Sequence, residues 1–509
     1  MWKKGLLVVI VVSVGFSSLA QKKEERLESS FIEQPSRIEL DISDDDQDYM
    51  IVPAEEDGLL VFRETYNRGD GGFFWEFNHL DTTLTNQWTK TFPLPYGSFF
   101  MGHDYSLGNV FILLGTVRGR SFDQFQLLGM NLATGDTVNH IVDIGFPVDL
   151  KEFEVVGDMA IFGGYANYRA VIVLYNLTDR KKKVLPGFYN MRSELLDIKT
   201  DDDNRQFSVL MTDRFRAKNQ SIQLKTYDDK GFILQSSKLD PGREKNLIYG
   251  QSTKFNEGSQ YISGTFAQRR SSYSKGVYMA KFEDNQQEYL KYFNYADLEN
   301  FFSYMSAKRR DRVKERIKRR KIKGKRVRLN YRLLVHDVLK LGDVNILIGE
   351  AYYPKYVLST YGPLHLEYYR DTYGTGIEGY RYTHAVVIAF NESGDIVWDN
   401  SFEINDILTL DLKQFVHVAG DEDRIVLLYM YEGEVRSKLI EGNEVVEGKT
   451  YNPIRLKFED DIIESKADNV EGLEKWYGNS FYAYGIQRIV KGSDRKRREI
   501  FYINKISYK

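Results

Sequence analysis

The chain has 509 residues, enough for a large core, and carries 70 Lys and Arg against 73 Asp and Glu, a formal net charge of −3. A chain this close to neutrality is not basic as a whole, so any site that attracts anions must be local. Cysteine is absent, which excludes disulfides, thiolate metal sites, a thiol nucleophile and a lipid-modified cysteine. The 35 Tyr, 31 Phe and 40 Gly beside only 10 Pro favour β structure, because aromatic residues suit pleated surfaces and Gly suits tight turns.

The N-terminal residues have the order of parts of a secretory signal peptide. Lys3 and Lys4 form a cationic start, residues 5–16 are apolar, and small residues end this stretch at Ala20. The apolar part spans about a dozen residues, fewer than the roughly 18 to 20 of a membrane-spanning helix. We therefore expect residues 1–20 to be a signal peptide, with an uncleaved anchor as the alternative. The mature chain is expected in the periplasm, at the cell surface or outside the cell, in a bacterium.

The chain repeats one pattern, an apolar run directly after a tight turn. A second pattern follows most of these runs, in which an apolar strand, a polar turn and another strand succeed each other, as around Gly135 and Gly394. Such turns supply the positive φ angles that hairpins need. Each unit is therefore expected to contain four antiparallel strands. The eight apolar runs begin at Gly58, Gly108, Gly157, Asn204, Gly258, Gly342, Asp423 and Gly478.

Four-stranded units of roughly 50 residues resemble the blades of a β-propeller. The resemblance covers nearly the whole mature chain and concerns the fold alone, since neither a WD nor a kelch signature is present. It implies an all-β, single domain over residues 21–509 with about eight blades; seven blades and separate β-sandwich domains are the alternatives. The last unit ends on a third strand, and residues 36–42 form a strand without a unit of their own. The N-terminal strand is thus expected to complete the C-terminal blade and close the ring.

In propellers, the loops between second and third strands share a face with the connections between blades. Here these loops are basic, whereas the turns on the opposite face collect acidic runs such as residues 55–57 and 201–203. Asp is frequent in tight turns for backbone reasons, so the acidic face alone is weak evidence. Arg has no such preference, and we expect the basic loops to bind an anionic partner. Their candidate binding residues are Arg214, Arg216, Arg269, Arg270, Arg497 and Arg498.

A basic insertion over residues 298–329 belongs to the same face. Residues 309–328 contain thirteen Lys or Arg and two acids. A helix is expected from Leu298 to Lys323, ending near Gly324, and most of it should project into solvent because its apolar stripe is thin. Like charges at this density repel unless an anion is present; the alternative is a solvated helix without a ligand. The candidate binding residues here are Arg309, Arg310, Arg312, Arg316, Arg319 and Arg320.

A tyrosine-rich insertion, residues 352–383, is expected beside the basic one, as a loop between the second and third strands of the sixth unit. Tyr offers a large apolar area and a hydroxyl group at low entropic cost, which is why binding surfaces favour it. The alternative is a lid that only covers the centre of the ring. The candidate binding residues in this loop are Tyr353, Tyr361, Tyr368, Tyr369 and Tyr373.

Signals of known catalytic or cofactor sites are weak. The seven His have no close metal-ligand spacing, and no nucleophile elbow is present. Residues 374–379 match a dinucleotide-binding glycine pattern, but a strand follows them where such a site needs a helix. We therefore predict neither a metal nor a cofactor, and leave catalytic residues unassigned.

These observations predict an exported binding or scaffold protein without a transmembrane span in its mature chain. Its basic, tyrosine-bearing face would engage an anionic envelope protein, a glycan or a lipid head group. The alternative is an enzyme that acts on polysaccharides at the centre of the ring, which requires carboxylates that converge there. The export signal argues against a nucleic-acid partner, and the oligomeric state is left open.

Overall fold

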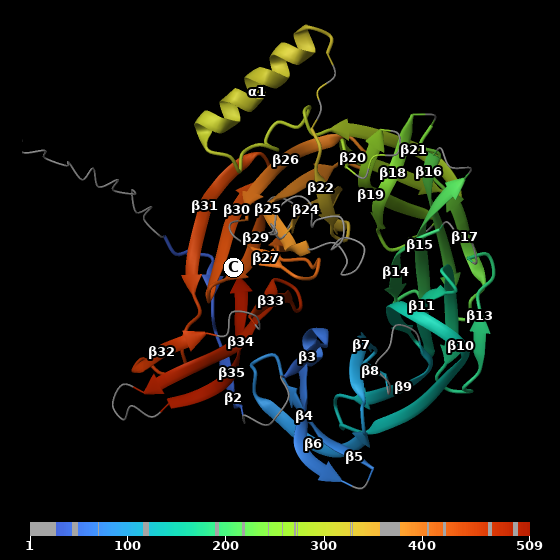
Figure 1. Cartoon of the computed structure of the whole chain (residues 1–509), viewed down its shortest axis with the longest axis vertical. Coiled ribbons are helices and arrows are strands. Elements are labelled where there is room, and N and C mark those ends of the chain that lie inside the picture. The colour runs from blue at the N-terminus through green and yellow to red at the C-terminus, as the bar shows by residue number, and fades with distance from the viewer. Residues whose placement is uncertain are drawn as a thin grey trace, which may run out of the picture.

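The computed structural model describes residues 27–42, 49–69, 71–115, 122–188, 193–215, 219–242, 244–256, 258–268, 271, 273–325, 327, 329–356, 377–404, 407–420, 424–466, 471–491 and 497–509. Nearly all regular structure in this part of the chain is antiparallel β-sheet. The sheets follow each other around a central axis and form a closed ring (Figure 1). The predicted signal peptide, residues 1–20, lies outside the described residues.

The first half of the ring contains four blades. One strand, β10, is the outer strand of the second blade and then the inner strand of the third, so these two blades form one seven-stranded sheet. The ladder of β10 shifts between Asp143 and Val148, where Gly145 has a φ of +84°. The strands are β3 (Met50–Pro53), β4 (Leu59–Gly69), β5 (Gly72–Leu80), β6 (Asn86–Pro95), β7 (Phe99–Ser106), β8 (Asn109–Gly115), β9 (Phe122–Asn131), β10 (Thr137–Val156), β11 (Met159–Ala166), β12 (Arg169–Asn176), β13 (Lys182–Val184), β14 (Leu195–Asp201), β15 (Gln206–Phe215), β16 (Asn219–Asp228) and β17 (Ile233–Lys238).

The second half of the ring contains four more blades, with the basic insertion between the fifth and sixth and the tyrosine-rich insertion within the sixth. The one α-helix in the described residues is α1 (Ala307–Ile322). A short 3-10 helix, η1 (Glu55–Asp57), lies in the first blade between β3 and β4. The strands are β18 (Lys245–Ser252), β19 (Ser259–Gln268), β20 (Gly276–Glu283), β21 (Gln286–Asn294), β22 (Arg332–Val335), β23 (Leu339–Leu341), β24 (Val344–Tyr356), β25 (Ile377–Phe390), β26 (Ile396–Glu403), β27 (Leu408–Thr409), β28 (His417–Gly420), β29 (Arg424–Tyr431), β30 (Glu434–Glu441), β31 (Glu444–Pro453), β32 (Asp461–Lys466), β33 (Gly472–Lys475), β34 (Ser480–Lys491) and β35 (Arg497–Tyr508).

The N-terminal strands close the ring, as predicted. Both β1 (Ile32–Glu33) and β2 (Arg37–Asp41) pair antiparallel with β35, the last strand of the chain. The predicted closing strand, residues 36–42, coincides with β2. The C-terminal blade thus combines β32 to β35 with strands that are more than four hundred residues away in sequence.

The core lies between the blades rather than at the centre of the ring. Within the described ranges, the buried apolar side chains form eight clusters, and each cluster joins two consecutive blades. On β8, Val110 and Ile112 belong to the cluster shared with the first blade, and Phe111 and Leu113 to the cluster shared with the third. Successive side chains on a strand point to opposite faces, and both faces of a blade are covered. This explains why the sequence shows continuous apolar runs where one-sided sheets would alternate.

The eighth cluster joins the last blade to the first, through Phe501 and Ile503 of β35 and Leu59 and Val61 of β4. This order of sheets and clusters defines a β-propeller and agrees with the predicted count of eight blades. No helix in the described residues is both long and apolar enough to cross a membrane.

Candidate functional site

Both insertions leave the ring at the same end of the fifth and sixth blades. Helix α1 lies in the connection from β21 to β22, and the tyrosine-rich insertion joins β24 to β25. Because consecutive strands are antiparallel, connections between blades emerge at the same end as loops between second and third strands. Figure 1 shows α1 outside the ring, next to β26.

The segment before α1 is held against the sixth blade by hydrogen bonds and buried rings. The Asp399 carboxylate accepts the backbone N–H groups of Glu299 and Asn300, each at 2.8 Å, and the Ser401 Oγ accepts the N–H of Tyr304 at 3.0 Å. Phe301 and Phe302 of this segment are fully buried. The predicted start of the helix at Leu298 is therefore wrong: these tertiary bonds replace helical ones, and α1 begins at Ala307.

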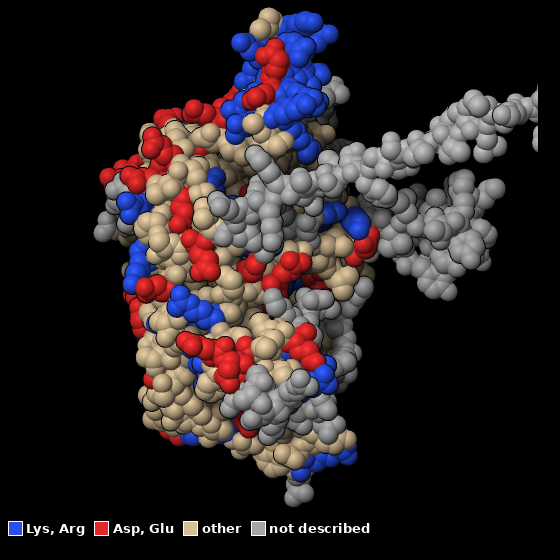
Figure 2. All heavy atoms as spheres, turned by 90° about the vertical axis from the view of Figure 1, so that its left-hand side faces the viewer, with Lys and Arg blue, Asp and Glu red and all other residues tan. Residues whose placement is uncertain are grey.

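Helix α1 itself is mostly exposed, as predicted. Ile317 is its one buried residue, and Lys314 and Lys321 fasten its inner side, through the Glu299 carbonyl at 3.0 Å and the Asp297 carboxylate at 2.6 Å. The helix ends at Ile322, and Gly324 has a φ of +61°, which favours glycine. Figure 2 shows Lys and Arg side chains concentrated on this projecting helix.

A groove of about 840 Å³ lies between α1 and the base of the β24–β25 hairpin. Four arginines line it, Arg309 and Arg316 from α1, Arg332 from β22 and Arg381 from β25. Glu403 is the one acidic residue among its described lining residues. We call this the arginine–tyrosine groove, and its tyrosines are Tyr273, Tyr304, Tyr331, Tyr352, Tyr353 and Tyr382.

The arginines of α1 are available to a ligand. In the described part of the chain, no ion pair joins Arg309 or Arg316 to an acidic residue. Arg332 lies over the ring of Tyr273, at 4.9 Å from its centroid. Burial raises the pKa of Tyr331, and Arg309 and Arg316 act against that rise, so both cations lie close to its hydroxyl group. A guanidinium that binds no carboxylate retains its fork of donors for a carboxylate or phosphate of a ligand.

The tyrosine wall of the groove is rigid where it meets the core. The Tyr304 ring stacks on the buried ring of His384, with centroids 3.7 Å apart and planes 5° from parallel. Burial lowers the pKa of His384 to about 3, so this imidazole is neutral at physiological pH. His384 is thus a packing residue on β25, where the sequence suggested the edge of a loop.

The ends of the tyrosine-rich insertion differ from the prediction. Residues 352–356 extend β24 and residues 377–383 belong to β25, because the ladder between these strands continues to Tyr356. Tyr353 lies on this extension, is 45% exposed and lines the groove. The other predicted tyrosines, Tyr361, Tyr368, Tyr369 and Tyr373, lie outside the described residues.

The remaining predicted arginines are spread over the molecule. Arg310, Arg312, Arg319 and Arg320 lie on α1 without lining the groove. Arg497 is paired with Glu464 at 2.5 Å, and Arg498 with Glu39 at 2.7 Å and Asp461 at 2.6 Å, so their charges are already matched on the last blade. Arg214 lies on β15, and nothing is described of its side chain; Arg216, Arg269 and Arg270 lie outside the described residues.

Two arginines of the groove were not predicted. Arg332 begins the short strand β22, and Arg381 lies on β25 within the tyrosine-rich insertion. Strand pairing relates them to the tyrosines: Arg332 is the partner of Tyr352, and Arg381 of Tyr353. Side chains of directly paired residues lie on the same side of a sheet. The tyrosine-rich sequence drew attention to this edge of the sixth blade, but identifying its arginine partners required the strand register.

Comparisons with known proteins find similarity to solved structures alone. No family model matches the chain, and no curated protein does. Among solved structures, the chain is similar to the β-propeller domain of the Trilobed protease from Pyrococcus furiosus, with 9% identity, a TM-score of 0.36, and 80% of this chain and 95% of that chain covered. It is also similar to the Dos1 propeller, with 9% identity, a TM-score of 0.39, and 78% of each chain covered. A third similar structure is the polysaccharide lyase Uly1, with 12% identity, a TM-score of 0.37, and 95% of this chain and 99% of that chain covered.

Proposed function

We propose that this protein is a binding protein that takes up an anionic ligand in the arginine–tyrosine groove. Export to the cell envelope, expected from the N-terminal sequence, would place the groove before anionic glycans, lipid head groups and proteins. The observation that supports this proposal most is the excess of four arginines over one acid around a groove walled by six tyrosines.

The physical argument rests on charge and shape together. Arginine forks bind carboxylates and phosphates through two parallel hydrogen bonds, and tyrosine rings offer flat apolar surface with a hydroxyl group at the rim. The groove's volume of about 840 Å³ lies within the range of about 300 to 1,000 Å³ usual for small-ligand pockets. A solvated basic helix alone would explain the charge of α1, but it would not explain Arg332 and Arg381 opposite it.

The proposal is tested with a pair of matched charge reversals on α1. The double variant R309E/R316E alters the two groove arginines, and R312E/K318E alters two exposed cations on the same helix that do not line the groove. Binding is measured to vesicles containing an anionic phospholipid, to a uronate polysaccharide and to their neutral counterparts, at about 0.05 and 0.2 M salt.

We expect the groove variant to lose at least about tenfold in affinity for one anionic probe, because the ligand loses two guanidinium partners and meets two carboxylates in their place. The control variant should change mainly the salt dependence. Equal losses in both variants would show a non-specific charge run, and unchanged binding in R309E/R316E would refute the proposal.

A further inference from the structure

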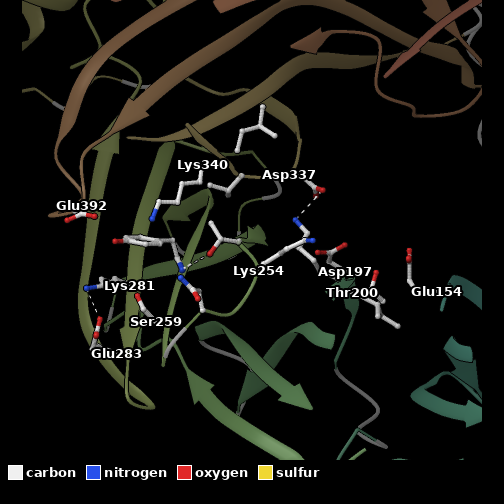
Figure 3. A pocket seen from close by; sticks show the side chains of 17 residues that line it. Glu154, Asp197, Thr200, Lys254, Ser259, Lys281, Glu283, Asp337, Lys340 and Glu392 are labelled. Atoms are coloured by element: carbon white, nitrogen blue, oxygen red, sulfur yellow. Dashed lines mark hydrogen bonds and ion pairs between the residues drawn. The ribbon is translucent and has the colours of Figure 1, made fainter. Parts of the chain in front are cut away.

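A second cavity, of about 800 Å³, lies on the inner side of the ring, away from the arginine–tyrosine groove. Glu154 on β10, Asp197 on β14 and Asp337 between β22 and β23 line one side of it. Asp104 on β7 and Glu152 on β10 interact with these acids by charge, and we call all five the inner carboxylates. Figure 3 shows Glu154, Asp197 and Asp337 on one side of the cavity and Lys281, Lys340 and Glu392 on the other.

Two of the inner carboxylates, Asp104 and Glu154, lie close together, and each is shielded from solvent. The Asp104 Oδ2 accepts the N–H of Val155 at 2.6 Å. Burial and the charge of Asp202 raise the pKa of Asp104 to about 7, and burial and the charge of Asp104 raise the pKa of Glu154.

Asp197 has a carboxylate oxygen that no described group satisfies. The residue lines the cavity, and its Oδ2 is buried without a hydrogen bond to any described residue. Lys199 attracts it, but the Lys199 ammonium is already bound to Asp337 at 3.1 Å. Glu152 and Asp337 repel it, Glu154 lies within range of its charge, and its own charge helps to raise the pKa of Tyr249 on β18. A buried carboxylate in this state is costly unless it binds a proton or a cation joins it.

Most of the cavity's own cations are already used. Lys281 is paired with Glu283 and Glu288 at 2.7 and 2.9 Å, and Lys254 lies 3.7 Å from Asp201. Among the described lining residues, Lys340 is the one lysine without an ion pair, whereas three acids have none: Glu154, Asp197 and Glu392. The described residues contain no group of three His, Asp or Glu able to hold a metal ion.

We propose that this cavity binds an organic cation that carries primary ammonium groups. An ammonium group has three donors and suits carboxylates that approach from different strands, as Asp197 and Glu154 do. A neutral sugar would leave the repulsion among the inner carboxylates in place, whereas a cation offsets it. The site is independent of the arginine–tyrosine groove, which has the opposite charge.

Calorimetric titration of the whole protein with spermidine, and separately with trilysine, tests the proposal at pH 6 and pH 8. Binding of either supports the ammonium chemistry, and the better ligand shows whether the source is a small polyamine or a lysine side chain. We expect affinity to be about tenfold higher at pH 8, because a cation must displace a bound proton at pH 6. Two variants complete the design, D197N and the control E444Q, which removes an exposed carboxylate from β31.

D197N should weaken binding at least about tenfold, while E444Q and the groove variant R309E/R316E should bind as the unaltered chain does. If R309E/R316E lost none of its affinity for anionic probes, that result would contradict the proposed function of the groove and would leave the cation site untouched. Absence of binding, equal affinity in D197N, or affinity independent of pH would overturn the proposal. So would release of sugar from a polysaccharide that D197N abolishes, which would identify the inner carboxylates as catalytic.

Discussion

Asp197 makes a prediction for stability that needs no ligand. Burial, with repulsion from Asp337 and Glu152, raises the pKa of its carboxyl group from 3.8 to about 7. Between these values the folded protein holds a proton that the unfolded chain releases, so this residue makes stability fall as pH rises from about 4 to 7. The amide of D197N cannot ionise. We expect D197N to raise the free energy of unfolding by about 2–4 kcal/mol at pH 8 and by little at pH 4.

Urea unfolding of D197N and of the unaltered chain at pH 4, 6 and 8 measures this effect, with E444Q as the control that should show no trend. A D197N variant that is less stable at pH 8 than the unaltered chain would mean that the carboxylate is ionised and well paired. In that case the inferred need for a cation would disappear as well.

At the residue scale, sequence reasoning found charges but not their partners. Arg309 and Arg497 look alike in the sequence, since each stands in a run of basic residues. Arg309 faces the groove, whereas Arg497 is paired with Glu464, thirty-three positions away. The inner carboxylates were missed for the same reason. They come from different blades and become neighbours only where the inner strands converge.

At the scale of elements, the end of α1 was predictable and its start was not. A glycine that ends a helix is a local signal, and Gly324 marked the end through its positive φ. The start depends on Asp399, which lies about a hundred positions away and accepts the N–H groups of Glu299 and Asn300. The strand ends of the tyrosine-rich insertion were likewise set by a partner strand, since β24 and β25 continue to pair as far as Tyr356.

Asp399 should therefore control the attachment of the basic insertion. In D399A, two part-buried N–H groups lose their charged acceptor, which costs about 1–3 kcal/mol each, and the segment before α1 should detach locally. Limited trypsin digestion reports this directly, because α1 is rich in Lys and Arg. We expect several-fold faster cleavage within residues 307–322. The control is D395A, which removes an exposed carboxylate that pairs with Lys291 near the same strand; equally fast cleavage in both variants would contradict the role of Asp399.

At the scale of the whole molecule, the ring was predictable because it is a repeat. Each unit buries both faces against its neighbours, and so the same apolar run recurs in the sequence. The unpaired strand at the N-terminus and the incomplete last unit together indicated how the ring closes. The shared strand β10 was not foreseen, because a register shift near Gly145 gives no separate signal in the sequence.

Closure by β2 should matter for the stability of the entire ring. Ile38 pairs with Ile503 of β35 and packs into the cluster between the last and first blades. Replacing it in I38D puts a charge into this contact, and we expect the free energy of unfolding to fall by about 1–3 kcal/mol. Ile462 on β32 of the same blade is 61% exposed, so the control I462D should change it by less than about 0.5 kcal/mol. Urea unfolding followed by tryptophan fluorescence measures both, and an I38D variant as stable as I462D would show that the N-terminal strand is dispensable for closing the ring.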